Sequence, residues 1–342
     1  MKRIISILLT TISILTFSAC GQLSDPEPPT SVLPDSDSHY PVTITDHAGR
    51  DVVIEDEPQR LISCYYITSS LMIALDLDEN IVGIEDNPDY RPIYARSAPH
   101  LLELPWVGTA KSLDAEQCAA LNPDLVILPL RLKDSAEILD GLGIDVLFVN
   151  PESQQLLVEM IQMVAAATNR EEIADELLTF LSAQESYLLD TCSCTDSPTV
   201  YLSGNSNFLS TAGDSMYQSD MIRLAGGTNV ASSIPDTYWA EIDYEQLLVW
   251  NPEYIILPSS AKYSVEDILN DPNLITCTAV QNKTVFQIPN DAESWDSPVP
   301  SSILGAVWLA NILHPDKVSD AICSDLMDEY YETFYNFTYT QN

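Results

Sequence analysis

The sequence predicts an α/β protein of two Rossmann-like lobes that are joined by a long rigid α-helix, with a ligand cleft between the lobes. The first observation is a repeat. Residues 113–129 and 242–258 match at a constant offset, which pairs Glu116 with Glu245. The second observation is that strand and helix patterns alternate through both halves of the 342 residues, as in a mostly parallel sheet covered by helices. One unit repeated at a domain-sized interval indicates two similar lobes.

Each copy of the repeat has the pattern helix, turn and strand. Asp114 and Asp243 can accept hydrogen bonds from the first free N–H groups of a helix, with glutamine three residues later, in a capping-box arrangement. Asn-Pro then ends the helix, because proline lacks an N–H group and disfavours the helical conformation of the residue before it. The apolar runs 125–128 and 254–257 are short enough to be strands that are buried on both faces.

The other elements of the first half are predicted from their periodicity and turn residues. Thr68 is a plausible helix cap, and Gly143 stops a helix. In chain order we expect a hairpin over 42–54, a strand over 60–63, a helix over 68–75, a strand over 81–84, the first repeat unit, a helix over 135–142 and a strand over 145–149.

Two helices connect the halves. The first carries an apolar stripe between residues 156 and 164, and the second is a long amphipathic helix that is roughly 30 Å in length. Asn169 and Glu172 form a possible capping box at its start. Because one long helix is stiffer than a flexible crossover, we expect limited hinge motion between the lobes.

In the second half, Gly226 ends a helix because glycine readily adopts the left-handed conformation. There we expect a strand over 199–203, a helix over 215–224, the second repeat unit, a strand over 284–288 and helices over 301–313 and 318–334. The whole chain then divides into a lipoprotein signal peptide (1–20), a disordered tether (21–41), an N-terminal α/β lobe (42–168), a connecting helix (169–197), a C-terminal α/β lobe (198–316) and a C-terminal helix with its tail (317–342).

The N-terminus predicts export and a lipid anchor. Lys2 and Arg3 precede an apolar run that is too short for a comfortable membrane span. Phe17-Ser18-Ala19-Cys20 is typical of a lipobox, in which Cys20 is lipidated and becomes the mature N-terminus; the alternative is an ordinary signal peptide cleaved after Ala19. We therefore expect the protein on the outer face of the cytoplasmic membrane, at the cell surface or in the periplasm, and attached only by its lipid.

Composition limits the partners and the chemistry. With 14 basic and 51 acidic residues the net charge is −37, which argues against nucleic acid and against attraction to an anionic membrane. The four histidines form no metal-ligand pair in the sequence, and no phosphate loop, dinucleotide fingerprint or nucleophile motif occurs. We expect no enzyme activity, no cofactor and no metal site.

The six cysteines after Cys20 do not have the spacing of a metal site. Cys64 and Cys118 lie on apolar segments and are expected as small core residues. The pair Cys192 and Cys194 is expected at the surface, and no disulfide pairing is assigned.

Ligands of open α/β sheets bind beyond the carboxyl ends of the strands. That rule nominates residues that follow four predicted strands. Two tryptophans in polar, proline-containing loops are also expected to be exposed beside the cleft, where they would suit a flat or conjugated ligand. The candidates are Tyr65, Tyr66, Arg131, Asn205, Asn207, Ser259, Ser260, Trp239 and Trp295.

These pieces together resemble a known family. Several segments are similar in order and spacing to the solute-binding lipoproteins of ABC importers for iron–siderophores, haem and cobalamin. They are residues 42–54, 60–63, 106–108, 113–128, 225–229, 242–257, 295–298, 304–305 and 308–310. The resemblance covers residues 42 to about 335. It implies an ABC permease dimer with its ATPase as partner, and permease arginines that meet Glu116 and Glu245. Independently of the resemblance, each glutamate also favours the positive end of its helix.

The sequence leaves the ligand open. The resemblance implies an iron complex (siderophore or haem) or cobalamin. Anionic siderophores generally need several basic residues in the cleft, and few lie near the predicted one, which favours a neutral or cationic complex, or haem with a tyrosine ligand. These basic residues are Lys111, Arg91, Arg96, Arg131 and Lys262. The resemblance implies molybdate or tungstate as the alternative ligand, since some members of this group carry it, and one or two well-placed arginines suffice for an oxoanion. The alternative from another class is a surface lipoprotein that binds a macromolecular partner without transport.

Overall fold

The computed structural model describes residues 39–135, 137–193, 197–234 and 239–340. The predicted signal peptide, Cys20 and most of the predicted tether lie outside these residues, as does Cys194. At the start of the described part, His39 Nε2 lies 2.8 Å from the carbonyl oxygen of Ala166, and the Tyr40 hydroxyl donates to that of Ala167 (3.1 Å). Within the described part, no helix is both long enough and apolar enough to cross a membrane.

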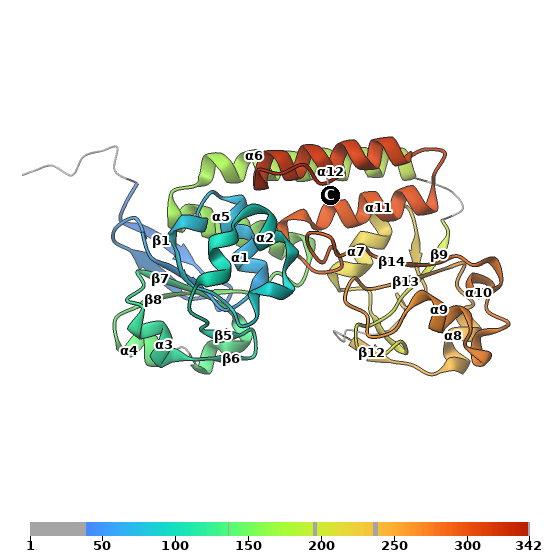
Figure 1. Ribbon diagram of the computed structural model, residues 1–342, viewed down its shortest axis with the longest axis horizontal. Helices are drawn as coiled ribbons and strands as arrows, with labels where there is room; N and C mark the ends of the chain where they lie inside the picture. Colours follow the sequence, from blue (N-terminus) through green and yellow to red (C-terminus); the bar gives the residue numbers. More distant parts are fainter. Residues whose placement is uncertain (1–38, 136, 194–196, 235–238, 341–342) are drawn as a thin grey trace, which may run out of the picture. The chain divides into compact units, whose positions relative to one another are not determined.

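The N-terminal lobe is built on a parallel sheet with the strand order β4-β3-β7-β8. All five residues of β7 are buried, because helices cover both faces of the sheet (Figure 1). Alternate β7 side chains divide between the faces: Leu125 and Ile127 pack with α1 and α5, and Val126 and Leu128 pack with α3 and α4. The bounds are β3 Leu61–Ser63, β4 Ile81–Gly83, β7 Leu125–Pro129, β8 Asp145–Val149, α1 Tyr66–Ala74, α3 Ala115–Ala120, α4 Glu137–Gly141 and α5 Gln154–Thr168.

The C-terminal lobe repeats this plan. Its parallel sheet has the order β11-β9-β13-β14. Ile256 of β13 packs with α7 and α11, whereas Ile255 and Leu257 face α8, α9 and α10. The predicted class of two similar α/β lobes is therefore confirmed. The bounds are β9 Thr199–Leu202, β11 Thr228–Asn229, β13 Tyr254–Leu257, β14 Val285–Gln287, α7 Tyr217–Leu224, α8 Tyr244–Trp250, α9 Val265–Leu269, α10 Thr278–Asn282 and α11 Ile303–Leu313.

Both copies of the repeat form the predicted helix, turn and strand, although only the aspartate half of each capping box is present among the described residues. The Asp114 carboxylate accepts a hydrogen bond from the Gln117 N–H (2.9 Å), and that of Asp243 accepts one from the Gln246 N–H (2.8 Å). The asparagine after each helix, Asn122 or Asn251, has a positive φ (47° and 46°). Asparagine tolerates this left-handed conformation, so each helix ends there before the proline.

The connection between the lobes differs in one detail from the prediction. The long helix α6 (Glu171–Cys192) has 22 residues and a length of about 33 Å. The expected capping box of Asn169 and Glu172 is wrong: Asn169 is left-handed (φ 55°) and ends α5, and Arg170 occupies the start of α6 without a side-chain cap. Asn169, which could have capped α6, therefore ends α5 instead.

Two further local predictions are wrong. Helix α1 begins at Tyr66, so Thr68 is a buried residue inside the helix rather than its cap. Cys192 is only 1% exposed because it packs at the end of α6, although the sequence around it is polar. Cys64 and Cys118 are buried, as expected.

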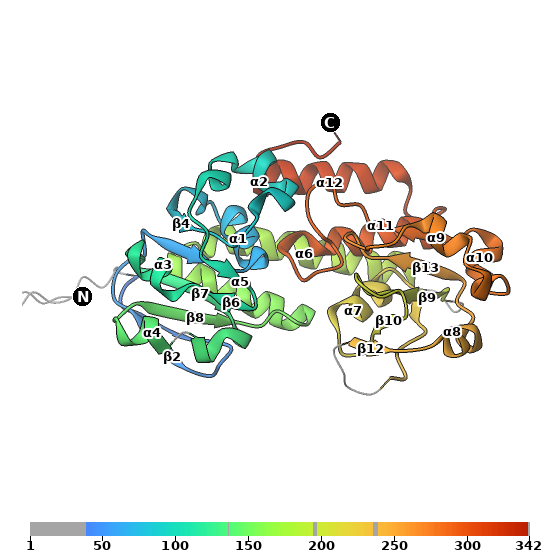
Figure 2. The same ribbon diagram turned by 60° about the horizontal axis from the view of Figure 1, so that its bottom comes forward.

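The C-terminal helix α12 (Asp320–Tyr335) packs beside α11 and also against α1 of the N-terminal lobe (Figures 1 and 2). Arg96 of α2 donates to the carbonyl oxygens of Thr338 and Tyr339, each at 3.1 Å. The chain therefore contacts the N-terminal lobe again at its end. The remaining elements are β1 Val42–Thr45, β2 Asp51–Ile54, η1 Asp78–Asn80, η2 Pro88–Tyr90, α2 Pro92–Ser97, η3 Pro99–Glu103, β5 Gly108–Thr109, β6 Ser112–Leu113, η4 Leu130–Ser135, β10 Ser210–Ala212, β12 Trp239–Glu241, η5 Pro272–Leu274 and η6 Pro300–Ser302.

Candidate ligand-binding cleft

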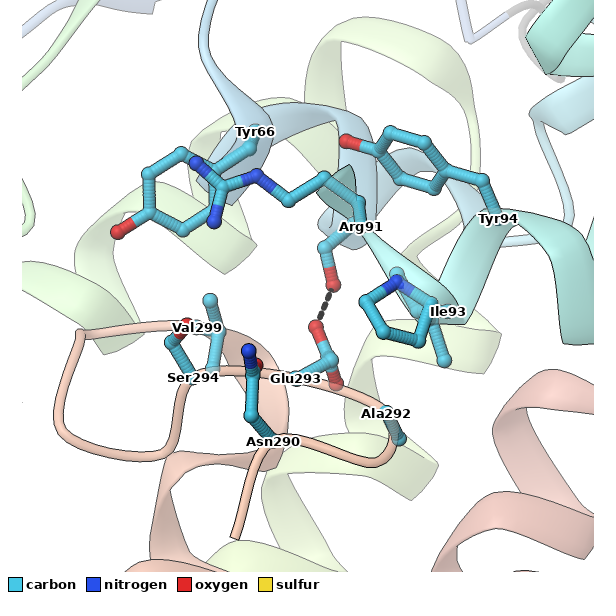
Figure 3. Close-up of a pocket in the computed structure, with 11 residues that line it drawn as sticks. Tyr66, Arg91, Ile93, Tyr94, Asn290, Ala292, Glu293, Ser294 and Val299 are labelled. Carbon is cyan, nitrogen blue, oxygen red and sulfur yellow. Dashed lines mark hydrogen bonds between the residues drawn. The ribbon is translucent and has the colours of Figure 1, made fainter. Parts of the chain in front are cut away.

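A small cavity lies where residues after β3 and β4 of the N-terminal lobe meet the loop that follows β14 of the C-terminal lobe. The two sides are tied by a hydrogen bond from the Ile93 N–H to the Ala292 carbonyl oxygen (3.1 Å). The cavity measures about 10 Å³, which is the room of roughly one water molecule. It is lined by Tyr66, Ser70, Arg91, Pro92, Ile93, Tyr94, Asn290, Ala292, Glu293, Ser294 and Val299 (Figure 3).

Arg91 is the cation of this cavity. It stands between η2 and α2, two short helical turns that each begin with proline and so fix the backbone on either side of it. Its guanidinium carbon lies 3.7 Å from the centroid of the Tyr66 ring, a cation–π contact (Figure 3). Among the described residues, the guanidinium makes no hydrogen bond and no ion pair. Its donors are therefore available to a ligand.

Glu293 is a buried carboxylate on the opposite side of the cavity. It accepts hydrogen bonds from the hydroxyls of Ser70 and, at 3.5 Å, Tyr331. The Ser70 hydroxyl also lies 2.9 Å from that of Tyr335. Burial raises the pKa of Glu293, although these hydroxyl donors act against the shift. Glu293 thus joins α1 of one lobe to α12 and the β14 loop of the other.

Glu293→Gln should flatten the dependence of stability on pH. Because the folded-state pKa is raised above the ordinary value of 4.5, the folded protein holds more protons than the unfolded chain. The stabilising contribution is complete below about pH 4.5 and is lost as pH rises through the folded-state pKa; each tenfold difference in proton affinity between the two states is worth about 1.4 kcal/mol. Urea unfolding between pH 4.5 and 8 would measure the slope. The exposed Glu172→Gln is the control, and equal slopes for wild type and Glu293→Gln would contradict the prediction.

Two other buried carboxylates accept hydrogen bonds from neighbouring residues of the cleft. Glu85, which follows β4, accepts hydrogen bonds from the hydroxyls of Tyr94 (2.5 Å) and Ser69 (2.7 Å). Asp296 accepts hydrogen bonds from the Ser259 hydroxyl (2.7 Å) and N–H (3.2 Å). Burial raises the pKa of both carboxyls, which favours their neutral forms. The nearby Arg91 acts against this shift in both, but among the described residues their hydrogen-bond partners are hydroxyls and an N–H group, and neither carboxylate forms an ion pair with Arg91.

Three of the predicted ligand residues lie together beside Arg91. Tyr66 lines the cavity, and its ring centroid is 5.5 Å from that of Tyr65. Arg131 follows β7 as expected, with its guanidinium carbon 6.0 Å from the Tyr65 ring centroid. It is already paired with Glu152, whose carboxylate oxygen is 3.4 Å away. The carboxyl ends of β3 and β7 therefore converge as the sequence predicts, and Arg131 makes an ion pair whereas Arg91 makes none among the described residues.

The other predicted residues have different places. Ser259 is bound to Asp296 in the loop region of the cleft. Asn207 is exposed, and its side-chain oxygen accepts from the Leu209 N–H (3.0 Å) in a tight turn. Trp239 is 40% exposed, as expected, and lies on β12. Asn207 and Trp239 do not line the cavity.

Trp295 is not an exposed aromatic, contrary to the prediction. It is 1% exposed, and its indole N–H donates to the Tyr331 hydroxyl (3.0 Å). Its ring also lies beside that of Tyr339, with the centroids 5.6 Å apart. Aromatic residues of α12 and the tail, far along the sequence, supply the apolar surroundings that the local sequence lacks.

Three cavity residues, Glu293, Ser70 and Asn290, are not among those predicted from the sequence. Residues 288–296 follow the carboxyl end of β14, so the rule that nominated the other loops applies to this one as well. Ser70 carries no such signal, because it is a buried residue of α1 that reaches the cavity one turn after Tyr66. Arg91 is one of the few basic residues near the predicted cleft, but the sequence does not show that it makes no ion pair in the folded protein.

The structure also brings together one group of potential metal ligands. The donor atoms of Asp78, Glu79 and His100 lie within 4.8 Å of one another at the surface of the N-terminal lobe. His100 Nε2 is 3.2 Å from the Asp78 carbonyl oxygen. This contact between η1 and η3 accounts for the position of the ring without an ion.

The repeated glutamates lie away from the cavity. Glu116 is in the first turn of α3 and Glu245 in the first turn of α8. Both side chains are exposed, and neither makes a hydrogen bond or an ion pair within the described part of the chain. Their surroundings therefore leave both carboxylates free to meet another molecule.

Two α/β lobes, a long connecting helix and a cleft at the carboxyl ends of the strands define a binding protein of the bilobal type. The family comparison agrees: residues 61–292 match the model of the periplasmic binding protein family, and the chain belongs to that family.

Several known proteins are similar over most of their length. The molybdate-binding protein MolA of Haemophilus influenzae is 26% identical over 323 residues, which cover 86% of this chain and 91% of MolA. An uncharacterised ABC transporter substrate-binding lipoprotein of Bacillus subtilis, YvrC, is 24% identical and covers 90% of this chain and 96% of its own length. A cobalamin-binding protein of Halobacterium salinarum is 21% identical, with 91% of this chain and 85% of the relative covered.

The crystal structure of MolA with bound molybdate superposes on this chain with a TM-score of 0.77 and covers 87% of this chain and 99% of MolA. A periplasmic solute-binding protein of Veillonella parvula has a TM-score of 0.75, is 24% identical and covers 88% of this chain and 94% of its own. At 24% identity, the likeness to the Veillonella parvula protein supports the fold alone.

Proposed function

We propose that this chain is the exported, lipid-anchored substrate-binding component of an ABC importer, and that its cleft captures a small oxoanion of the molybdate or tungstate type. The observation that carries the choice of ligand is Arg91, a cleft arginine stacked on Tyr66 whose guanidinium makes no ion pair and no hydrogen bond among the described residues. A guanidinium with free donors is suited to a tetrahedral oxoanion, because its planar fork can donate two parallel hydrogen bonds.

The other groups at the cavity are compatible with such a ligand. Asn290 and Ser294 can donate hydrogen bonds from the opposite wall. Burial favours the neutral form of Glu293, which reduces repulsion of an anion. The similarity to a molybdate-binding protein at 26% identity points to the same ligand class. No cofactor and no catalytic residue is needed for this function.

The second candidate is a larger complex, a cobalamin or an iron chelate, which the scarcity of basic residues favours. The adjacent rings of Tyr65 and Tyr66 offer an aromatic surface for it. A cavity of about 10 Å³ would have to open widely for such a ligand, whereas an oxoanion requires a much smaller opening.

Calorimetric titration of the full-length protein separates these candidates. We expect saturable binding of molybdate or tungstate, weaker binding of sulfate and phosphate, and no heat with cobalamin, haemin or ferric siderophores. Saturable binding of a chelate without molybdate binding would overturn the oxoanion assignment and leave the importer function intact. Binding of none of these solutes would favour a surface lipoprotein with a macromolecular partner.

We propose that Glu116 and Glu245 dock the loaded protein on a permease dimer. Each is exposed at the start of its repeat helix, and each offers a free carboxylate to a permease arginine. A pseudo-symmetric pair of carboxylates suits a partner with two similar subunits.

A further inference from the structure

We infer that each docking glutamate stands in an acidic groove that also presents an apolar side chain, and that each groove receives a basic permease segment bearing an apolar residue of its own. This inference rests on the proposed importer function. It adds a partner chemistry to that function: the contact would combine charge pairs with apolar burial, and residues other than the two glutamates would determine its strength.

The first groove, here the α3 groove, has a volume of about 600 Å³. Its carboxylates are Asp86, Asp114 and Glu116, and the described residues that line it include no lysine, arginine or histidine. Lys111 lies in the turn between two lining strands, β5 and β6. The full lining is Asp86, Trp106, Gly108, Thr109, Ser112, Leu113, Asp114, Ala115, Glu116 and Ile138.

Exposed apolar side chains lie among these carboxylates. Ile138 at the start of α4 is 59% exposed, and Trp106 is 48% exposed. A leucine one turn further, Leu142, is just as exposed (60%) but does not line the groove. Exposed apolar surface is therefore present both inside and outside the α3 groove, which provides a matched comparison.

The second groove, here the α8 groove, has a volume of about 710 Å³. It contains three carboxylates, Glu241, Asp243 and Glu245, and again no basic residue among the described lining residues. Its apolar side chain is Val249, which is 74% exposed, one turn beyond Glu245 on α8. Trp250 follows it in the lining.

The two grooves are built in the same way. Each is bordered by the first turn of a repeat helix and by a two-stranded antiparallel sheet, β5–β6 in one lobe and β10–β12 in the other. In each, one aspartate is occupied with capping its helix, whereas Glu116, Glu241 and Glu245 make no hydrogen bond among the described residues. Three carboxylates together select a basic partner segment.

The apolar side chains explain how such a contact would persist in salt. A fully exposed ion pair is screened and contributes little. An apolar contact beside the pair excludes water, lowers the local dielectric and strengthens the attraction. Ile138 and Val249 are placed to do this, because each shares a groove with a free glutamate.

The test uses the full-length protein and its cognate permease–ATPase complex, reconstituted in nanodiscs. We expect the double variant Ile138→Ser, Val249→Ser to weaken association by about tenfold to a hundredfold. The matched control is Leu142→Ser, Ile275→Ser, since Ile275 is 70% exposed and lies outside both grooves. We expect this control to bind like the wild type, and the wild-type affinity to fall as NaCl is raised.

The outcomes separate the inference from the function on which it rests. Absence of wild-type binding to the complex would overturn the docking proposal itself. Wild-type binding that is lost on removal of the glutamates but unchanged in Ile138→Ser, Val249→Ser would retain docking and overturn the apolar contact. An equal loss of association in the groove variant and in its control would also overturn the apolar contact, because the effect would then come from exposed apolar residues in general and not from the grooves.

Discussion

The double variant Glu116→Ala, Glu245→Ala should bind its solute with unchanged affinity and lose transport. Both carboxylates are exposed, outside the cavity, and without a hydrogen bond among the described residues. Losing one partner of a close charge pair at an interface costs about 2–5 kcal/mol, so two such losses should reduce permease affinity by more than about a thousandfold. Folding should change little, because a charge in the first turn of a helix contributes about 0.3–1 kcal/mol.

Uptake of labelled solute into proteoliposomes, with calorimetric solute affinity measured in parallel, checks this prediction. Each single variant should keep part of the transport, since one lobe can still dock. Glu172→Ala with Glu266→Ala is the matched control, because both glutamates are exposed in the first turn of a helix, α6 or α9. Undiminished uptake by the Glu116, Glu245 double variant would remove the docking role.

The fold could be predicted from the sequence because its signals are local. Strand β7 is an apolar run that follows Asn122-Pro123 and ends at Pro129, and its alternation between two packed faces needs no knowledge of distant residues. Asp114 and Asp243 cap helices three residues away. Where two local signals competed, the prediction failed: Asn169 suits both a cap and a left-handed helix end, and packing selected the second.

The site could be predicted only in part, because its details depend on distant contacts. The rule on strand ends predicts that Tyr65, Tyr66 and Arg131 lie at the same edge of the N-terminal sheet. It could not show that Glu152 pairs with Arg131 or that Arg91 is left unpaired. The burial of Trp295 likewise depends on Tyr331, 36 residues later.

Arg91 gives the prediction that decides the ligand class. Arg91→Ala should lose about 2–4 kcal/mol of molybdate affinity, or roughly 30-fold to a thousandfold, because charge-assisted hydrogen bonds from a partly buried guanidinium are lost. Arg91→Lys should recover only part of this, since lysine keeps the charge but not the planar fork or the stacking on Tyr66. Calorimetry with molybdate measures both, and thermal unfolding verifies that the variants fold.

Arg131→Ala is the comparison that isolates the role of the unpaired charge. Arg131 also lies beside the tyrosine pair, but its guanidinium is 3.4 Å from a Glu152 oxygen and 46% exposed, so much of its field is already compensated and screened. The Arg131→Ala substitution should therefore reduce molybdate affinity by less than tenfold. If Arg91→Ala bound molybdate like the wild type, the anion assignment would fail. If Arg131→Ala cost more than Arg91→Ala, the anion would have to sit beside Tyr65 instead, with Glu152 displaced from its arginine.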